Sequence, residues 1–251
     1  MKSVALVLCL LFSSLMLSAQ INTPATKLNT MSTTDWNNVF SGLQPLVTPK
    51  FNEVKGSPFL YDQYLPGAVY LTDSVRSPGQ NKFKLNIFDN EIWLQKDSIS
   101  KAEIILTNPR LVGLVLTKDG ITHTFKRLAL PSVNTTPVRK FAEIFYCGSL
   151  TLIKETQKEY LKSDRSDQSV LNGNSDQSSF ETKEIYYLAD ENGSIKKVRL
   201  RLTDILELYP TVVMKHKVNI DHFCKSKNIN KSLTETQLVD LLNYLSSIRM
   251  S

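Results

Sequence analysis

Short segments of alternating apolar and polar residues, separated by turn signals, constrain the fold of this chain more than any other feature. Residues 82–88 alternate cleanly, and Asp89-Asn90 joins them to a second extended segment at residues 91–95. Asp119-Gly120 is a strong hairpin signal, because these residues tolerate positive φ angles. The pattern predicts an α+β protein that is mainly antiparallel β, a meander forming a barrel-like or sandwich-like body with a C-terminal helical segment.

Further extended segments repeat at hairpin spacing along the middle of the chain. We expect them at residues 69–71, 102–106, 111–117, 121–128, 141–146, 150–153, 158–161, 184–188 and 195–200. Together with residues 82–95 they define an antiparallel β domain over residues 45–202. Residues 163–180 interrupt the pattern with Ser, Asp, Asn, Gln and Gly, which cannot bury enough apolar area to order themselves, and this predicts a flexible polar loop.

The last fifty residues change to a helical period. Residues 203–209 predict a short helix that ends at Pro210, and residues 211–225 carry a second apolar stripe. Residues 232–235, Ser-Leu-Thr-Glu, are typical of a capping box. A continuous apolar face follows it, made by Leu238, Leu241, Leu242, Leu245 and Ile248. We expect the helices of residues 203–251 to pack on the β domain; docking of this face on a partner is the alternative.

The N-terminus has the pattern of a secretory signal peptide. Lys2 precedes an apolar run at residues 4–17, and Ser18-Ala19 offers a small-residue cleavage site. Residues 1–19 are therefore expected to be removed on export, and residues 20–44 to form a lead-in with a short helix at 36–43. The pattern predicts a secreted protein of the periplasm, the extracellular space or the cell surface. No transmembrane span is expected after signal removal.

The chain has a formal net charge of +6, with local basic density near its last predicted strand. Lys197, Arg199 and Arg201 would share one face of an extended segment, which suggests a binding site for an anionic partner such as a phosphate-rich or lipid headgroup surface. The alternative is a solvated edge strand that positive charge protects from aggregation. Nucleic acid is not an expected partner of a secreted protein.

Two cysteines follow the signal peptide, Cys147 and Cys224. An oxidising compartment permits a disulfide between them, and two buried free thiols are the alternative. Cys147 precedes Gly148-Ser149, but nothing in the sequence pairs it with a particular histidine as a catalytic nucleophile.

The three histidines give few options for acid–base or metal chemistry. His216, His222 and Cys224 do not converge on one side of a helix, so we expect no metal site. His123 shares a strand face with Ile121 and Phe125, where it is either a general base or a hydrogen-bonded residue lining the sheet. No catalytic residue and no cofactor are predicted.

Several loose structural motifs resemble a group of uncharacterised secreted β-rich proteins of Bacteroidota. The matching pieces are residues 18–20, 56–60, 84–92, 186–188 and 238–244. The resemblance implies an extracytoplasmic β-rich domain and brings no known activity and no catalytic residues.

The leading hypothesis from the sequence is a non-enzymatic binding or structural protein of the bacterial envelope, whose partner is an envelope protein or a small ligand. A hydrolase of envelope polymers that uses two carboxyl groups is an alternative from a different class. A protein that docks partners through its C-terminal amphipathic helix is the third.

Overall fold

The computed structural model describes most of the β domain and the C-terminal helices. The described residues are 29–32, 36, 54–72, 75–78, 81–95, 103–106, 110–131, 139–147, 150–162, 178–190 and 193–249. The predicted signal peptide lies outside them, as does most of the lead-in. Of the short helix expected at residues 36–43, only Trp36 is described, and it is helical and buried.

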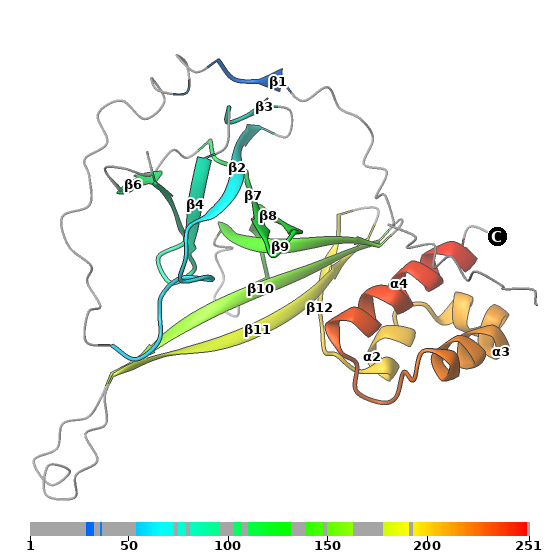
Figure 1. The fold of residues 1–251 in the computed structure, drawn as a ribbon. Coiled ribbons are helices and arrows are strands. Elements are labelled where there is room, and N and C mark those ends of the chain that lie inside the picture. Colours follow the sequence, from blue (N-terminus) through cyan, green and yellow to red (C-terminus); the bar gives the residue numbers. More distant parts are fainter. Residues whose placement is uncertain are drawn as a thin grey trace, which may run out of the picture.

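Strands of the described ranges form one large open sheet (Figure 1). They are β1 (Asn29–Thr30), β2 (Leu65–Thr72), β3 (Val75–Arg76), β4 (Asn81–Asn86), β5 (Glu91–Gln95), β6 (Glu103–Leu106), β7 (Gly113–Lys118), β8 (Ile121–Ala129), β9 (Arg139–Cys147), β10 (Leu150–Leu161), β11 (Ser179–Ala189) and β12 (Ile195–Val198). Apart from the parallel pair β1–β3, neighbouring strands are antiparallel. The predicted fold class, mainly antiparallel β with a C-terminal helical segment, is confirmed.

The strand order is β12-β11-β10-β9-β8-β7-β2-β4-β5-β6. From β7 to β12 each strand pairs with the next along the chain, which is the expected meander. The chain first builds β2, β4, β5 and β6, and then returns to place β7 on the other side of β2. Strands β6 and β12 form the two edges, so the body is not a closed barrel.

The two hairpin turns read from the sequence are present. Asp119 and Gly120 have φ angles of 51° and 79°, so both central residues of the β7–β8 turn are left-handed, as a type I′ turn requires. Asn90 has a φ angle of 58° in the turn between β4 and β5. Asparagine tolerates this conformation better than most residues do.

Strand β10 is longer than the sequence predicts. Residues 150–153 and 158–161 belong to one strand, Leu150–Leu161, which pairs with β11 along its whole length. The polar residues 154–157 interrupt the apolar pattern but not the strand. Lys154 contacts Glu184 on β11, and Glu155 accepts hydrogen bonds from Lys140 on β9 and Tyr187 on β11. The predicted loop at 163–180 also ends earlier, since Ser179 and Phe180 already belong to β11. Residues 163–177 lie outside the described ranges.

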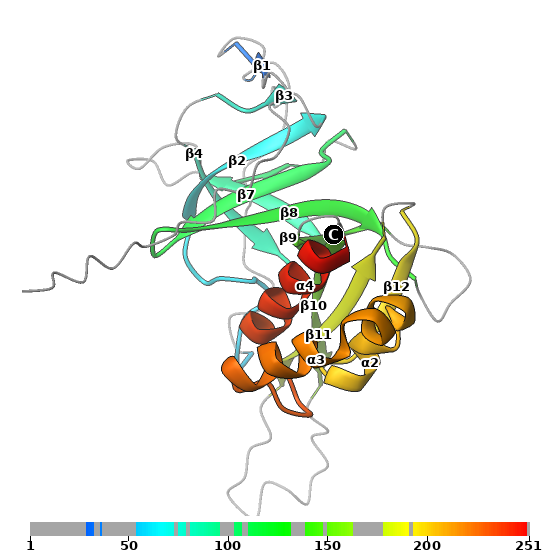
Figure 2. The ribbon, with the colours of Figure 1, turned by 90° about the vertical axis from the view of Figure 1, so that its right-hand side faces the viewer.

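Three helices follow the sheet and cover one side of the half built from β9 to β12 (Figures 1 and 2). They are α2 (Leu202–Leu206), α3 (Pro210–Ser226) and α4 (Glu235–Arg249). Pro210 begins α3 rather than only ending α2, because proline is well suited to the first turn of a helix.

The capping box of α4 lies two residues later than predicted. The Thr234 hydroxyl accepts a hydrogen bond from the Gln237 N–H at 3.2 Å, and the Gln237 side chain accepts one from the Thr234 N–H at 3.0 Å. Ser232 cannot be the cap, because it forms an isolated bridge with Arg201 and the backbone is still extended there. The predicted box at 232–235 is therefore wrong in register, although the helix that it announces is present.

Hydrophobic side chains gather in two main clusters on the same face of the sheet. The sheet cluster contains Val69, Leu114 and Phe125 among others from β2 to β9. The helix–sheet cluster joins side chains of β9–β12 to those of α2, α3 and α4. The apolar face of α4 packs into it through four fully buried leucines, Leu238, Leu241, Leu242 and Leu245. The expectation that this face packs within the chain is confirmed.

Candidate functional site

A row of side chains crosses the sheet and connects the two hydrophobic clusters. Residues paired across neighbouring strands point to the same face, so the register defines the row. It runs through Val69, Leu114, Phe125, Glu143, Lys154, Tyr186 and Val198, from β2 to β12. Its outer members belong to the sheet cluster and the helix–sheet cluster, and Glu143 and Lys154 lie between them. We call this central part, with the side chains around it, the polar row.

Glu143 is paired with a histidine. The Nδ1 atom of His123 lies 2.6 Å from the Glu143 carboxylate, and Glu143 is only 8% exposed. The expectation of a hydrogen-bonded histidine on the sheet is thus confirmed. A carboxylate on Nδ1 fixes the orientation of the ring, and Nε2 has no partner among the described residues.

Lys154 lies at the centre of a second group. Its ammonium is 2.8 Å from the Glu235 carboxylate and 3.2 Å from that of Glu184. The Tyr186 hydroxyl contacts the same two carboxylates, at 3.0 and 2.9 Å. Burial and these carboxylates raise the pKa of Tyr186. The pKa of Lys154 is also raised: burial acts to lower it, but the hydrogen bond and charge of Glu235 and then Glu184 outweigh that effect.

This second group fastens α4 to the sheet. Glu235 is the first residue of α4, and Lys154 and Glu184 come from β10 and β11. The Lys154 ammonium contacts oxygens of Glu184 and Glu235 at 3.2 and 2.8 Å, so these oxygens are at most 6.0 Å apart. A carboxylate in the first turn of a helix also interacts favourably with the helix dipole.

Tyr61, in the segment before β2, lies over both groups. Its ring centroid is 5.8 Å from that of His123, and the Lys118 ammonium is 5.3 Å from the Tyr61 ring centroid. Burial raises the pKa of Tyr61, as do the charges of Glu143 and Glu235, against the lowering effect of Lys154. The Tyr61 hydroxyl has no hydrogen-bond partner among the described residues. Like Nε2 of His123, it is therefore free to hydrogen-bond to a ligand as far as the described residues are concerned.

Sequence reasoning singled out only His123 from the polar row. A signal for Glu143 was present, because it occupies an inward-facing position between Phe141 and Phe145 on a strand. In β10, Lys154 points to the same apolar face as Leu152, two residues earlier on the strand. Tyr61 and Glu235 could not be found this way, since they reach the row from a loop and a helix terminus.

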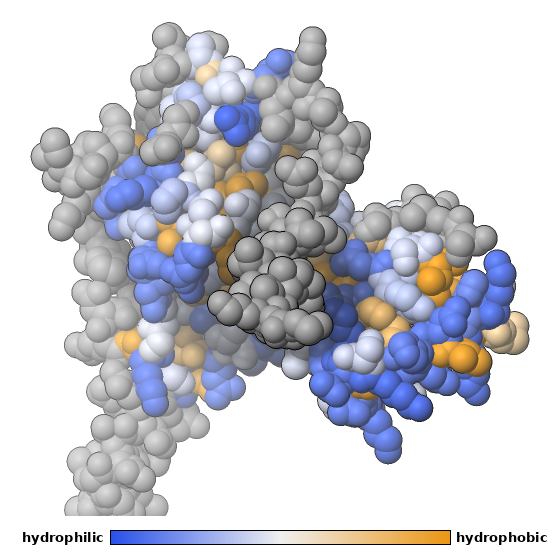
Figure 3. Space-filling view, turned by 45° about the vertical axis from the view of Figure 1, so that its right-hand side comes forward, coloured by the Kyte–Doolittle hydropathy of each residue, from blue (hydrophilic) through white to orange (hydrophobic). Residues whose placement is uncertain are grey.

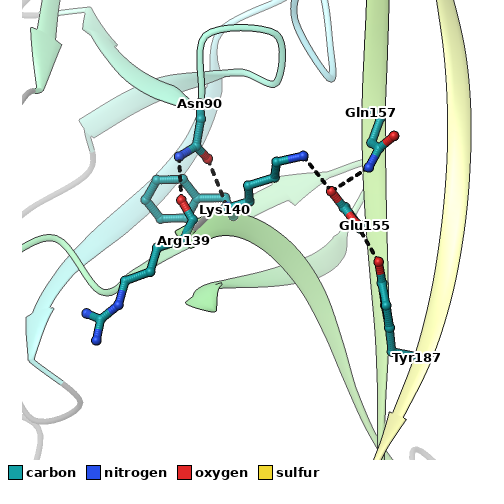
Figure 4. Close-up of polar contacts among 7 residues, drawn as sticks. Asn90, Arg139, Lys140, Glu155, Gln157 and Tyr187 are labelled. Carbon is teal, nitrogen blue, oxygen red and sulfur yellow. Dashed lines mark hydrogen bonds and ion pairs between the residues drawn. The ribbon is translucent and has the colours of Figure 1, made fainter. Parts of the chain in front are cut away.

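The opposite face of the sheet carries a separate buried carboxylate (Figure 4). Glu155 accepts hydrogen bonds from Lys140 at 2.9 Å, Gln157 at 2.7 Å and Tyr187 at 2.9 Å. Burial raises the pKa of Glu155, but the hydrogen bonds from Gln157, Lys140 and Tyr187 outweigh it and hold the pKa below its usual range. This carboxylate has its partners in place, which indicates a structural role.

Beside this cluster, Asn90 connects the β4–β5 turn to β9 (Figure 4). Its side-chain amide donates to the Arg139 carbonyl at 3.0 Å and accepts from the Phe141 N–H at 2.9 Å. These two bonds replace part of a strand pairing at the first residues of β9.

All three residues of the predicted anionic site, Lys197, Arg199 and Arg201, are exposed. Strand β12 ends at Val198, so only Lys197 lies on it, and its neighbour Lys196 is exposed as well. Arg199 pairs with Asp204 through two contacts, at 2.6 and 3.3 Å, and Arg201 precedes α2. Strand β12 is an edge of the sheet, so its exposed lysines, Lys196 and Lys197, lie where positive charge protects a strand from edge-to-edge pairing.

Both cysteines are buried free thiols in the helix–sheet cluster. This corresponds to the second of the two alternatives for Cys147 and Cys224. Burial raises the pKa of Cys147 to about 11, against a lowering backbone hydrogen bond at Leu152. Such a thiol is a poor nucleophile at neutral pH.

The described residues contain neither a metal-binding cluster nor a membrane-spanning helix. No group of three or more His, Cys, Asp or Glu side chains in them has the arrangement of a metal site. None of the described helices combines the length and apolar character needed to cross a bilayer. His222 is exposed and Cys224 is buried, so they do not face one ligand.

Comparisons with known proteins add no relatives. No protein-family model, curated protein or solved structure matches this chain.

Proposed function

We propose that this chain is an exported, non-enzymatic binding protein of the bacterial envelope, and that it holds a small hydroxyl-rich ligand at the polar row. The observation that carries the proposal is a pair of polar groups without a hydrogen-bond partner among the described residues, the Tyr61 hydroxyl and Nε2 of His123, beside the buried Glu143. A binding site for a polar ligand needs a few such donors and acceptors beside buried groups, and a ligand hydroxyl can hydrogen-bond to both of them.

The charges around these groups favour an uncharged ligand. Glu143 is hydrogen-bonded to His123, and Lys154 is ion-paired with Glu184 and Glu235. A ligand with a strong charge would have to break one of these pairs. A saccharide or another polyol needs only donors, acceptors and an aromatic ring, which Tyr61 supplies.

The hydrolase alternative receives less support from the geometry. Glu184 and Glu235 are close enough for a pair of catalytic carboxylates, but the Lys154 ammonium is within 3.2 Å of both. It occupies the position that the bond to be cleaved would need between an acid and a nucleophile. The docking alternative loses its apolar face, because α4 buries its leucines inside the chain.

Native mass spectrometry of the protein isolated gently from its own cells tests the proposal. We expect an added mass that disappears in the double variant Tyr61→Phe, His123→Asn, and persists in the control Tyr160→Phe at the far end of β10. Equal occupancy in wild type and double variant would refute the site. Release of a cleaved product from an added polysaccharide would favour the hydrolase.

A further inference from the structure

Helix α3 carries an exposed surface that the polar row does not use. Residues 210–231 contain five lysines and one aspartate, a net charge of +4 in a chain whose total is +6. Most of the net positive charge is thus concentrated in α3 and the turn after it. Lys227 is ion-paired with Asp240 of α4, at 3.2 Å.

Two large hydrophobic side chains stand out on this helix. Met214 is 78% exposed and Val218 is 80% exposed, the highest values among the large hydrophobic residues of the described ranges. They are four residues apart in the sequence and lie on either side of His216, where α3 is kinked, and both side chains are open to solvent. Lys215 and Lys217 are exposed beside them, and Lys225 follows Val218 by two turns.

The position of α3 leaves this surface open. The helix packs against α4 and lies farther from the sheet than α4 does (Figures 1 and 2). The space-filling view shows hydrophobic side chains on the helical part of the molecule, surrounded by hydrophilic ones (Figure 3). A non-helical residue, His216, interrupts α3 between Met214 and Val218.

We propose that α3 docks the protein on the surface of an anionic phospholipid bilayer. Met214 and Val218 enter the headgroup region, and Lys215, Lys217 and Lys225 face the lipid phosphates. Two apolar side chains are too few for the core of a stable protein–protein interface, whereas shallow insertion supported by lysines suffices for reversible attachment to a membrane surface. The net charge of +4 in residues 210–231 is complementary to that surface.

Vesicle sedimentation of the exported protein tests this inference independently of any ligand at the polar row. The probe is vesicles of equal parts phosphatidylcholine and phosphatidylglycerol, with pure phosphatidylcholine as the comparison. We expect binding to the anionic vesicles alone, lost when salt is raised from about 0.1 M to about 1 M. The double variant Lys215→Glu, Lys217→Glu should weaken binding by at least about 25-fold, since each lysine contributes about fivefold.

Matched controls make the result specific to α3. Lys162→Glu with Lys183→Glu makes the same change in net charge at exposed positions near the far ends of β10 and β11 and should bind as wild type. Met214→Ser with Val218→Ser should weaken binding by about tenfold, while Ile121→Ser, at another exposed apolar residue, should not. Every variant carries the same N-terminus.

Three outcomes would overturn the inference. They are equal binding to neutral vesicles, unchanged binding of the Lys215 and Lys217 variant, and an absence of vesicle binding by a protein that instead binds polyglutamate, which would assign α3 to an acidic protein partner.

Discussion

Replacing Lys154 by methionine tests whether the polar row fastens the helices to the sheet. The substitution keeps most of the side-chain volume and removes the ammonium that lies between Glu184 and Glu235. Their nearest contacting oxygens are at most 6.0 Å apart, because both contact the ammonium, at 3.2 and 2.8 Å. At about 6 Å, two unit charges repel by about 0.7 kcal/mol in water and by about 3 kcal/mol at an effective dielectric constant of about 20.

The two carboxylates are 45% and 34% exposed, so the lower part of this range applies to the repulsion. Adding the lost attraction of two partly exposed ion pairs, we expect Lys154→Met to reduce the free energy of unfolding by about 2 kcal/mol. Adding Glu184→Gln removes the repulsion and should restore about 1 kcal/mol.

Urea unfolding followed by circular dichroism measures these differences, with Lys183→Met on the exposed side of β11 as the control. The raised pKa of Lys154 also fixes a pH dependence. The contribution is fully present below the ordinary lysine pKa of 10.5 and is lost as the pH rises through the higher folded value. A loss below about 0.5 kcal/mol in Lys154→Met, or no recovery in the double variant, would contradict the reasoning.

Three further predictions concern the fold. Glu155→Gln should make the free energy of unfolding less dependent on pH in the acid range. The folded pKa of Glu155 is below its ordinary 4.5, so its contribution to stability is present above pH 4.5 and is lost as the pH falls through the folded value. Acid-unfolding curves that run parallel for the two proteins would be inconsistent with this. Asn90→Ala should lower the free energy of unfolding by about 3 kcal/mol and Asn90→Gly by about 2 kcal/mol. Both variants lose two hydrogen bonds, but only alanine is strained by the positive φ angle at this position. Equal losses in chemical denaturation would exclude the contribution of strain. Leu241→Ala should lower the free energy of unfolding by about 2–5 kcal/mol, and Asn243→Ala, on the exposed side of α4, by less than about 0.5 kcal/mol. If thermal unfolding shows equal losses for the two variants, the leucine face of α4 is not part of the core and the docking role is favoured.

Local signals predict the local parts of this structure well. The Asp119-Gly120 turn and the leucine face of α4 each depend on neighbours in sequence, and both are present. The alternation at residues 82–88 holds for Phe83 and Leu85, but β4 ends at Asn86, which is buried although it is polar. The pairing of β2 with β7 depends on a contact across more than forty residues, which no local pattern specifies. The capping box lies at residues 234–237 rather than at the predicted 232–235, because a bridge between Ser232 and Arg201 keeps the backbone extended there.

The candidate site depended even more on long-range contacts. His123 could be placed on an apolar strand face from alternation alone, but its partner Glu143 is on the next strand and Tyr61 comes from a loop before β2. The sequence pattern predicts a break between two strands at Lys154, whereas this residue is an inward-facing charge within the single strand β10. Arg199 illustrates the reverse error, since the extended segment predicted for residues 195–200 ends at Val198, and Arg199 then pairs with Asp204.

The central claim is that a ligand binds at Tyr61 and His123, and imidazole NMR tests it most directly. The chain has three histidines, so the nitrogen resonances of His216 and His222 on α3 serve as internal references for that of His123. On addition of the soluble, lipid-free fraction of an envelope extract, we predict that the His123 resonances shift and those of the other two do not. If His123 stays unchanged at saturating extract, or if only the α3 histidines move, the polar row is not the binding site.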